Sequence, residues 1–114
     1  DDIVEGIVRI ADKPAAPGED WDADTPDPAT STAPYRIFNI GNSEPVQLLR
    51  YVDAIEAACG VEAIRNYMPM QPGDVLATWA DVDDLAEATG FRPKTSVEDG
   101  VKAFVDWYRD FYKV

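Results

Sequence analysis

The chain has 114 residues, a length that suits one domain with a hydrophobic core of its own. It carries 22 acidic and 10 basic residues, so its formal net charge is −12. This charge repels phosphate backbones and anionic lipid surfaces, and we therefore expect neither a nucleic-acid partner nor a membrane partner.

His and Cys, two residue types that commonly carry catalysis or bind metals, are scarce. The chain has no His, so the commonest general base and the commonest zinc ligand are both absent. The single Cys59 cannot form an internal disulfide, and we expect it to be a small buried apolar side chain. A single Cys makes a reducing compartment the simpler assumption, and with no signal peptide in the sequence we expect a cytoplasmic location. We predict no metal site and no catalytic residue in this chain.

The first third of the chain predicts one helix and one long loop. Apolar residues at helical spacing predict a helix over 2–12, with Asp1 or Asp2 as its cap. Residues 13–34 contain five prolines and five acidic residues and show no periodicity, so we predict a loop. A loop of this length is either mobile or laid over a functional surface.

The middle of the chain predicts strands around one clear helix. Residues 35–40 alternate in polarity and predict a strand. Pro45 then suits the first position of a helix that Gly60 ends, with Val46 near its start. A second strand is predicted over 63–68, and 75–79 suits a third short extended piece.

The segment between these last two strands predicts an exposed turn. Pro72 fixes its φ near −65° and Gly73 tolerates a positive φ, so Gln71 and Asp74 are expected on a sharp turn with outward side chains. Most such turns simply reverse the chain, and the turn acquires a functional meaning only from its context.

The last third predicts two helices. Asp81 is expected to cap a short helix over 82–89 that Gly90 ends. Thr95 and Glu98 have the spacing of a capping box, which predicts a final helix beginning at this point. One face of that helix is broadly apolar and is expected to be core. Its residues are Val97, Val101, Phe104, Val105, Tyr108, Phe111 and Tyr112.

Together these elements predict an α/β fold, a small mixed domain of about four helices and two or three short strands spanning residues 1–114. So little sheet for four helices, and an apolar helix at the very start, lead us to expect that the chain is part of a longer protein.

Several motifs in order carry a family resemblance. They are Phe38-Asn39-Ile40-Gly41-Asn42, the run Met70-Gln71-Pro72-Gly73-Asp74-Val75, and Ala80-Asp81. With the Pro- and Asp-rich insert, they resemble the C-terminal part of extended short-chain dehydrogenase/reductases that act on nucleotide sugars. Within that family the chain is most similar to the UDP-glucuronate 4-epimerases. Several motifs in the right order are much rarer by chance than any one of them.

The resemblance implies a substrate-binding domain that works beside an N-terminal Rossmann domain, which binds NAD, in an enzyme that is often a homodimer. The substrate would be a UDP-sugar, UDP-glucuronate in the closest subgroup, whose C4 hydroxyl is oxidised and then reduced from the other face. By the same resemblance Asp74 accepts hydrogen bonds from the ribose, Gln71 contacts the diphosphate or ribose, and Val46 touches the uracil. Relatives often have Arg where this chain has Gln71.

Two departures limit what this chain does alone. Its seven glycines never show the close spacing of a dinucleotide fingerprint. No Tyr is followed four residues later by Lys, so the proton-relay pair of the family is absent. We therefore expect the chain to bind no NAD and to be inactive without its neighbour.

Other functions stay open. Decarboxylation or dehydration of a nucleotide sugar are activities of the same family, and residues upstream would decide between them. A non-catalytic acidic protein-interaction module is the alternative from another class, with exposed tyrosines of the last helix as its partner surface. A stand-alone hydrolase has little support, because no pair of carboxylates is placed on a defined cleft.

Overall fold

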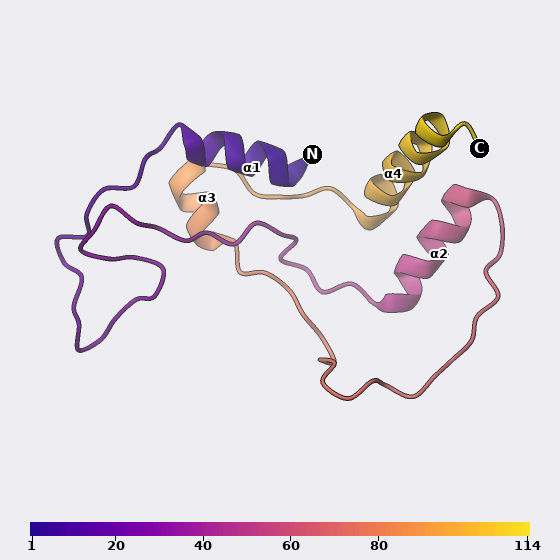
Figure 1. Ribbon diagram of the computed structural model, residues 1–114, viewed down its shortest axis with the longest axis horizontal. Coiled ribbons are helices and arrows are strands. Elements are labelled where there is room, and N and C mark those ends of the chain that lie inside the picture. Colours follow the sequence, from indigo (N-terminus) through magenta and orange to yellow (C-terminus); the bar gives the residue numbers. More distant parts are fainter. The chain divides into compact units, whose positions relative to one another are not determined.

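The computed structural model describes residues 1–114 and is built from four helices without a strand (Figure 1). The helices are α1 (Asp2–Ala11), α2 (Leu48–Cys59), α3 (Asp83–Thr89) and α4 (Val97–Tyr112). The prediction of an α/β fold is therefore wrong, although the number of helices is as predicted. None of the four helices combines the length and the apolar character that a membrane span needs.

The three predicted strands fail for one physical reason. A strand satisfies its backbone N–H and C=O groups only on a neighbouring strand, and the chain provides none. Residues 35–40 form a single isolated bridge, in which Arg36 pairs with Thr30. Residues 63–68 and 75–79 are irregular and exposed to solvent. Alternation in the sequence thus predicted strands that have no partner strand in this chain.

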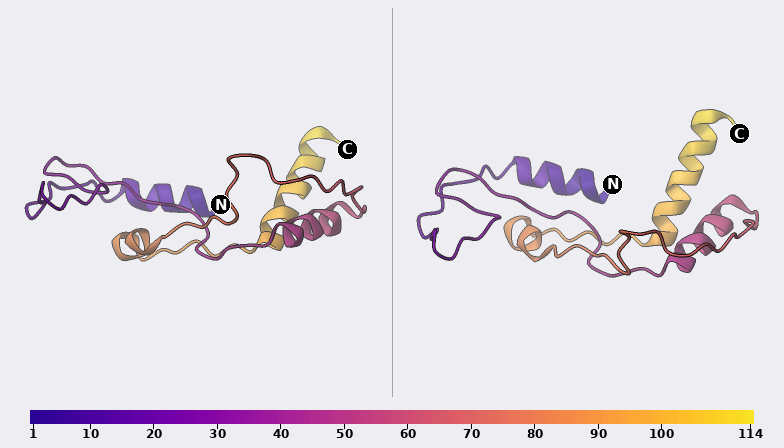
Figure 2. Two further views of the ribbon diagram at one scale, coloured as in Figure 1. Left: turned by 90° about the horizontal axis from the view of Figure 1, so that it is seen from below. Right: turned by 60° about the horizontal axis from the view of Figure 1, so that its bottom comes forward.

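Residue contacts divide the chain into two compact units. The α1–α3 unit consists of Asp1–Ser43 and Trp79–Lys94, and the α2–α4 unit consists of Glu44–Thr78 and Thr95–Val114. Each unit is therefore made from two separate stretches of sequence. Further views show the helices of each pair and the irregular segments that join them (Figure 2).

The α1–α3 unit packs its two helices around two fully buried side chains. Val82 and Leu85 are 1% and 0% exposed. Gly90 ends α3 at a φ of 66°, the left-handed conformation that favours glycine. The N-cap of α3 is Val82, one residue later than the predicted Asp81, whose carboxylate accepts the N–H of Asp83. The predicted contact face of this helix is confirmed for Val82 and Leu85.

The loop over residues 13–34 is held by its own polar side chains. Asp22 accepts the N–H of Asp24, and Asp27 accepts the N–H of Ala29, each at 2.9 Å. The indole N–H of Trp21 donates to the carbonyl of Asp27 at 3.2 Å. Such local bonds replace secondary structure in fixing a loop, so the predicted irregular segment has a defined course.

The α2–α4 unit confirms one predicted helix end and shifts two helix starts. Gly60 ends α2 at a φ of 70°, as predicted. The helix begins only at Leu48, so Val46 precedes it. For α4 the cap is Ser96, whose hydroxyl accepts the N–H of Asp99 at 3.0 Å, in place of the predicted Thr95 and Glu98. The predicted spacing of three residues between the capping pair was right, but the pair begins at Ser96, one residue after the predicted Thr95.

Charged groups join α2 and α4 at both ends. Near the helix starts, the guanidinium of Arg50 donates to both carboxylate oxygens of Glu98, at 2.7 and 2.9 Å. Near the helix ends, Arg109 donates to the carbonyl of Cys59 at 2.7 Å. The polar side chains of Glu98 and Arg109 therefore link α4 to α2.

The apolar stripe of α4 is mostly exposed, against the prediction that it is core. Only Val101 of the stripe is buried, at 7%. Phe104 and Phe111 are 60% and 63% exposed. Because α4 has sixteen residues and α2 only twelve, α2 leaves much of the broad apolar stripe of α4 uncovered.

Candidate functional site

The predicted turn over residues 71–74 is present. Asp74 donates its N–H to the carbonyl of Gln71 at 3.2 Å. Gly73 has a φ of 94°, and Pro72 precedes it, so this is a type II turn. The side chains of Gln71 and Asp74 are both exposed. A carboxylate and an amide three residues apart are thus presented to solvent on a fixed turn.

Val46 lies in a groove formed with the segment that follows this turn. The groove has a volume of about 650 Å³. Its lining residues are Pro45, Val46, Gln47, Leu48, Tyr51, Val75, Leu76, Ala77 and Thr78. Gln71 and Asp74 are not among them. Val46 therefore lines the same groove as the four residues directly after Asp74. The two polar residues of the turn, Gln71 and Asp74, lie outside the groove.

Two lining residues, Tyr51 and Thr78, were missed by the sequence reasoning. Tyr51 stands one turn inside α2 from Gln47, so the helical period was the signal that could have found it. Thr78 lay in a predicted strand, and no local pattern linked it to a helix thirty residues earlier. Their hydroxyls add hydrogen-bonding capacity to a groove whose other lining is largely apolar.

The start of α2 borders this groove and carries a positive field. The first N–H groups of a helix lack partners within the helix, and the side chain of the N-cap residue Gln47 satisfies none of them. No acidic residue stands in the first turn. This end of the groove therefore favours a negative group over a positive one.

Every cation of the α2–α4 unit is already engaged. Arg65 donates to Asp53 at 2.7 Å and to Glu56 at 2.6 Å, and these bonds raise its own pKa and hold the pKa of Glu56 below its ordinary value. Arg50 likewise lowers the pKa of Glu98. The three remaining cations, Lys102, Arg109 and Lys113, bond to Asp106, to α2 carbonyls and to Asp110. A diphosphate placed here would meet no unpaired cation from this unit.

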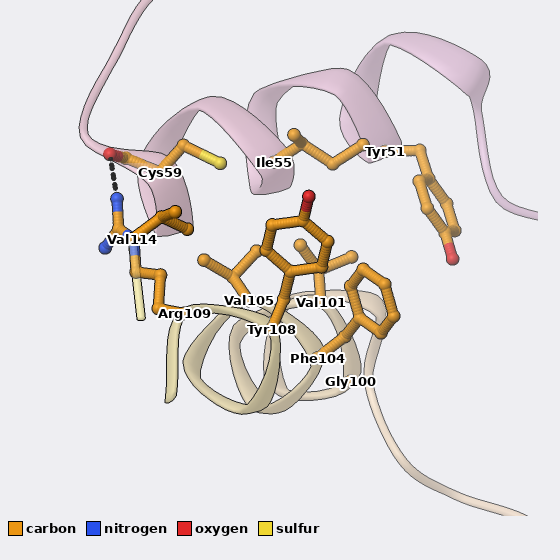
Figure 3. Close-up of a pocket in the computed structure, with 10 residues that line it drawn as sticks. All are labelled: Tyr51, Ile55, Cys59, Gly100, Val101, Phe104, Val105, Tyr108, Arg109 and Val114. Carbon is orange, nitrogen blue, oxygen red and sulfur yellow. Dashed lines mark hydrogen bonds between the residues drawn. The ribbon is translucent and has the colours of Figure 1, made fainter. Parts of the chain in front are cut away.

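A second groove of the same unit runs between α2 and α4 (Figure 3). It has a volume of about 640 Å³, and the side chains of Val101, Val105 and Tyr108 point from α4 toward α2. Cys59 lies at one end as a free thiol of intermediate exposure. The expectation that Cys59 is buried is therefore wrong. The lining is largely apolar, and its one cation, Arg109, is bonded to the carbonyl of Cys59.

The glycines of the chain do not fit a dinucleotide. Of the three with positive φ, Gly60 and Gly90 end helices and Gly73 lies in the turn. A dinucleotide fingerprint needs glycines between a strand and the start of a helix. The residues present therefore do not match NAD in the Rossmann manner. No group of three or more Cys, Asp or Glu side chains is placed to hold a metal ion.

The chain is similar in sequence to nucleotide-sugar epimerases, the class that its motifs resemble. Its named relatives include a probable UDP-glucuronate 4-epimerase of Rhizobium meliloti, 45% identical over 99% of the chain and 33% of the relative. UDP-glucuronate 4-epimerase 1 of Arabidopsis thaliana is 43% identical over 70% of the chain and 19% of the relative. These relatives confirm the resemblance to UDP-glucuronate 4-epimerases.

Another relative carries a different name. Protein CapI of Staphylococcus aureus is 53% identical over 99% of the chain and 34% of its own length. No protein-family model matches the chain. The chain spans about a third of the length of the curated relatives that match nearly all of it.

Proposed function

We propose that the α2–α4 unit binds the nucleotide of a UDP-sugar, within an NAD-dependent 4-epimerase whose catalytic residues lie outside this chain. The sugar is UDP-glucuronate. The observation that carries this proposal is the type II turn of Gln71 and Asp74, which leads directly into the groove that holds Val46. The names of the relatives supply the substrate class.

Asp74, Gln71 and Val46 each contact the nucleotide in this proposal. The Asp74 carboxylate accepts hydrogen bonds from the two ribose hydroxyls, which are donors. The amide of Gln71 offers neutral hydrogen bonds to the ribose or diphosphate, weaker than those of the Arg common in relatives. Val46 supplies an apolar surface for the flat uracil ring. Holding the nucleotide orients the distant sugar carbon, which is how remote binding assists a reaction.

The paired cations set the expected affinity. Since each cation of the unit is engaged, the diphosphate must be neutralised by residues elsewhere in the full enzyme. We therefore expect this chain alone to bind UDP in the millimolar range, and uridine almost as well as UDP.

Amide NMR of the 114-residue chain tests the assignment. Millimolar UDP should shift the signals of Val46, Asp74 and residues 75–78, and Asp74→Asn should reduce these shifts severalfold. Asp110→Asn is the matched control, because it removes an exposed carboxylate of the same unit outside the groove. Shifts that are unaffected by Asp74→Asn would contradict the role of that carboxylate.

A chimera separates a failed site from a missing neighbour. In the Rhizobium meliloti relative, the matching third is replaced by this chain, and conversion of UDP-glucuronate at C4 is followed by NMR of the sugar protons. We expect epimerisation, with Asp74→Asn raising KM more than it lowers kcat. Loss of the carboxylate as carbon dioxide would instead indicate a decarboxylase, and an active chimera indifferent to Asp74→Asn would overturn the site.

The second candidate function is a protein-interaction module. Exposed aromatic side chains on α4 favour it, with Phe104, Trp107 and Phe111 in successive ring contacts at 5.4 to 5.7 Å. A dispersed spectrum that UDP leaves unchanged, together with an inactive chimera, would favour this candidate.

A further inference from the structure

The α1–α3 unit contains a cavity of about 430 Å³ between α1, α3 and the loop over residues 13–34. Its wall includes an apolar side chain from each of them, Ile10, Ala88 and Pro14, and Phe38 from the segment that follows the loop. It also includes two cations, Lys13 and Arg36. This cavity lies in the other unit from the groove assigned to the nucleotide.

The charge of the cavity wall is opposite to the charge of the chain. No carboxylate lines the cavity, although the chain carries 22 acidic residues. The loop that covers it has five of them, and none belongs to the wall. Asp22 and Asp27 bond within the loop to its own backbone and threonines. The acidic side chains thus fix the course of the loop, while the cavity itself presents only positive charge.

The two cations have no acidic partner to neutralise them. Arg36 forms no ion pair, and its guanidinium lies 4.8 Å from the ring centroid of Phe38. Stacking on an aromatic ring occupies the face of a guanidinium and leaves the N–H groups at its edge free to donate. Lys13 donates to the carbonyl of Ala88, which bears no charge, so its positive charge also remains available.

We infer that this cavity binds a small organic anion, with a phosphate monoester or carboxylate held by Arg36 and Lys13 and an apolar body against Phe38 and Ile10. The planar fork of an arginine matches both of these oxyanions in two parallel hydrogen bonds. The surrounding negative charge of the chain weakens non-specific attraction of anions, so binding must depend on these two groups. The inference does not rest on the proposed UDP-sugar site, which belongs to the other unit.

Phenyl phosphate and benzoate serve as probes, because each joins an aromatic body to one of the two oxyanions. Phenol is the neutral control. We expect either probe, titrated into the full 114-residue chain, to shift the amide signals of residues 13–18 and 35–38 and the Nε–H signal of Arg36. The stronger of the two probes identifies the preferred oxyanion. Equal shifts from phenol would overturn the inference, as would no shift from either probe at millimolar concentration.

Variants of Arg36 then test its part in the binding. Arg36→Gln should weaken the better probe at least about tenfold, as expected for loss of a charge-assisted bidentate bond. Arg36→Lys keeps the charge without the fork and should have an intermediate effect. Arg92→Gln is the matched control, since Arg92 belongs to the same unit but pairs with Asp83 away from the cavity. Equal affinity for the Arg36→Gln and Arg92→Gln chains, both with dispersed spectra, would refute the assignment.

Discussion

The α1–α3 unit and the α2–α4 unit are each stabilised internally by a different kind of contact. The α1–α3 unit is short in helix, yet it buries Val82 and Leu85 almost completely. The α2–α4 unit has the two longest helices, but its buried apolar residues are Ala54 and Val101, still 8% and 7% exposed. Charged contacts join its helices instead. The amount of helix and the amount of core are thus independent, because burial depends on what covers an apolar face.

The largest expected effect comes from removing the core of the first unit. Leu85→Ala should reduce the free energy of unfolding of the α1–α3 unit by about 3 kcal/mol, since it deletes buried atoms and leaves a cavity. Hydrogen exchange measured amide by amide should show the loss in α1 and α3 and not in α2 and α4. Leu76→Ala, at a residue 91% exposed, should change stability by less than about 0.5 kcal/mol. Equal loss of protection in all four helices would show one cooperative unit.

A smaller effect is expected at the start of α4. Ser96→Ala removes the hydroxyl that accepts the N–H of Asp99, and should cost about 1 kcal/mol. The loss should appear in the exchange of α4 amides alone. Ser96→Asp keeps a capping oxygen and should recover most of it. If Ser96→Ala changes nothing, the cap belongs at Thr95, where the sequence first placed it.

The smallest effect concerns the acid sensitivity of the α2–α4 unit. Because folding lowers the pKa of Glu56, its bonds to Arg65 contribute fully above the ordinary glutamate pKa and are lost as the pH falls through the lower folded value. Arg65→Gln should return the pKa of Glu56 toward its ordinary value, measured by NMR of the side-chain carboxyl carbon. Arg109→Gln is the control, since Arg109 bonds to carbonyls. An unchanged titration of Glu56 in the Arg65→Gln chain would refute the pairing.

Local chemistry made the helices predictable. Gly60 and Gly90 both end helices in the left-handed conformation, and apolar spacing located α1 and α3 within a residue or two. Cap positions were less certain from sequence, because Thr95 and Ser96 are equally able to cap. The strands could not be judged locally at all, since a strand exists only with a neighbour whose identity no local pattern contains.

The turn of the candidate site could be predicted from the sequence, whereas its groove could not. Pro72 and Gly73 dictate the type II turn through their own backbone preferences. The groove is lined by Val46 and by residues 75–78, segments about thirty residues apart that only tertiary packing brings together. The prolines predicted the loop over residues 13–34, whereas the cationic cavity also needs Ile10, Arg36 and Ala88 from other segments, which only tertiary packing brings together.

The pairing of helix ends in the α2–α4 unit fixes how the two helices are oriented. Arg50 and Glu98 stand near the two starts, and Cys59 and Arg109 near the two ends, so α2 and α4 run parallel (Figure 1). Parallel helices align their dipoles, and like poles then repel at each end. Glu98 places a negative charge at the positive poles, and Arg109 places a positive charge at the negative poles. Salt should therefore loosen this pair of helices more than it loosens a pair held by buried side chains.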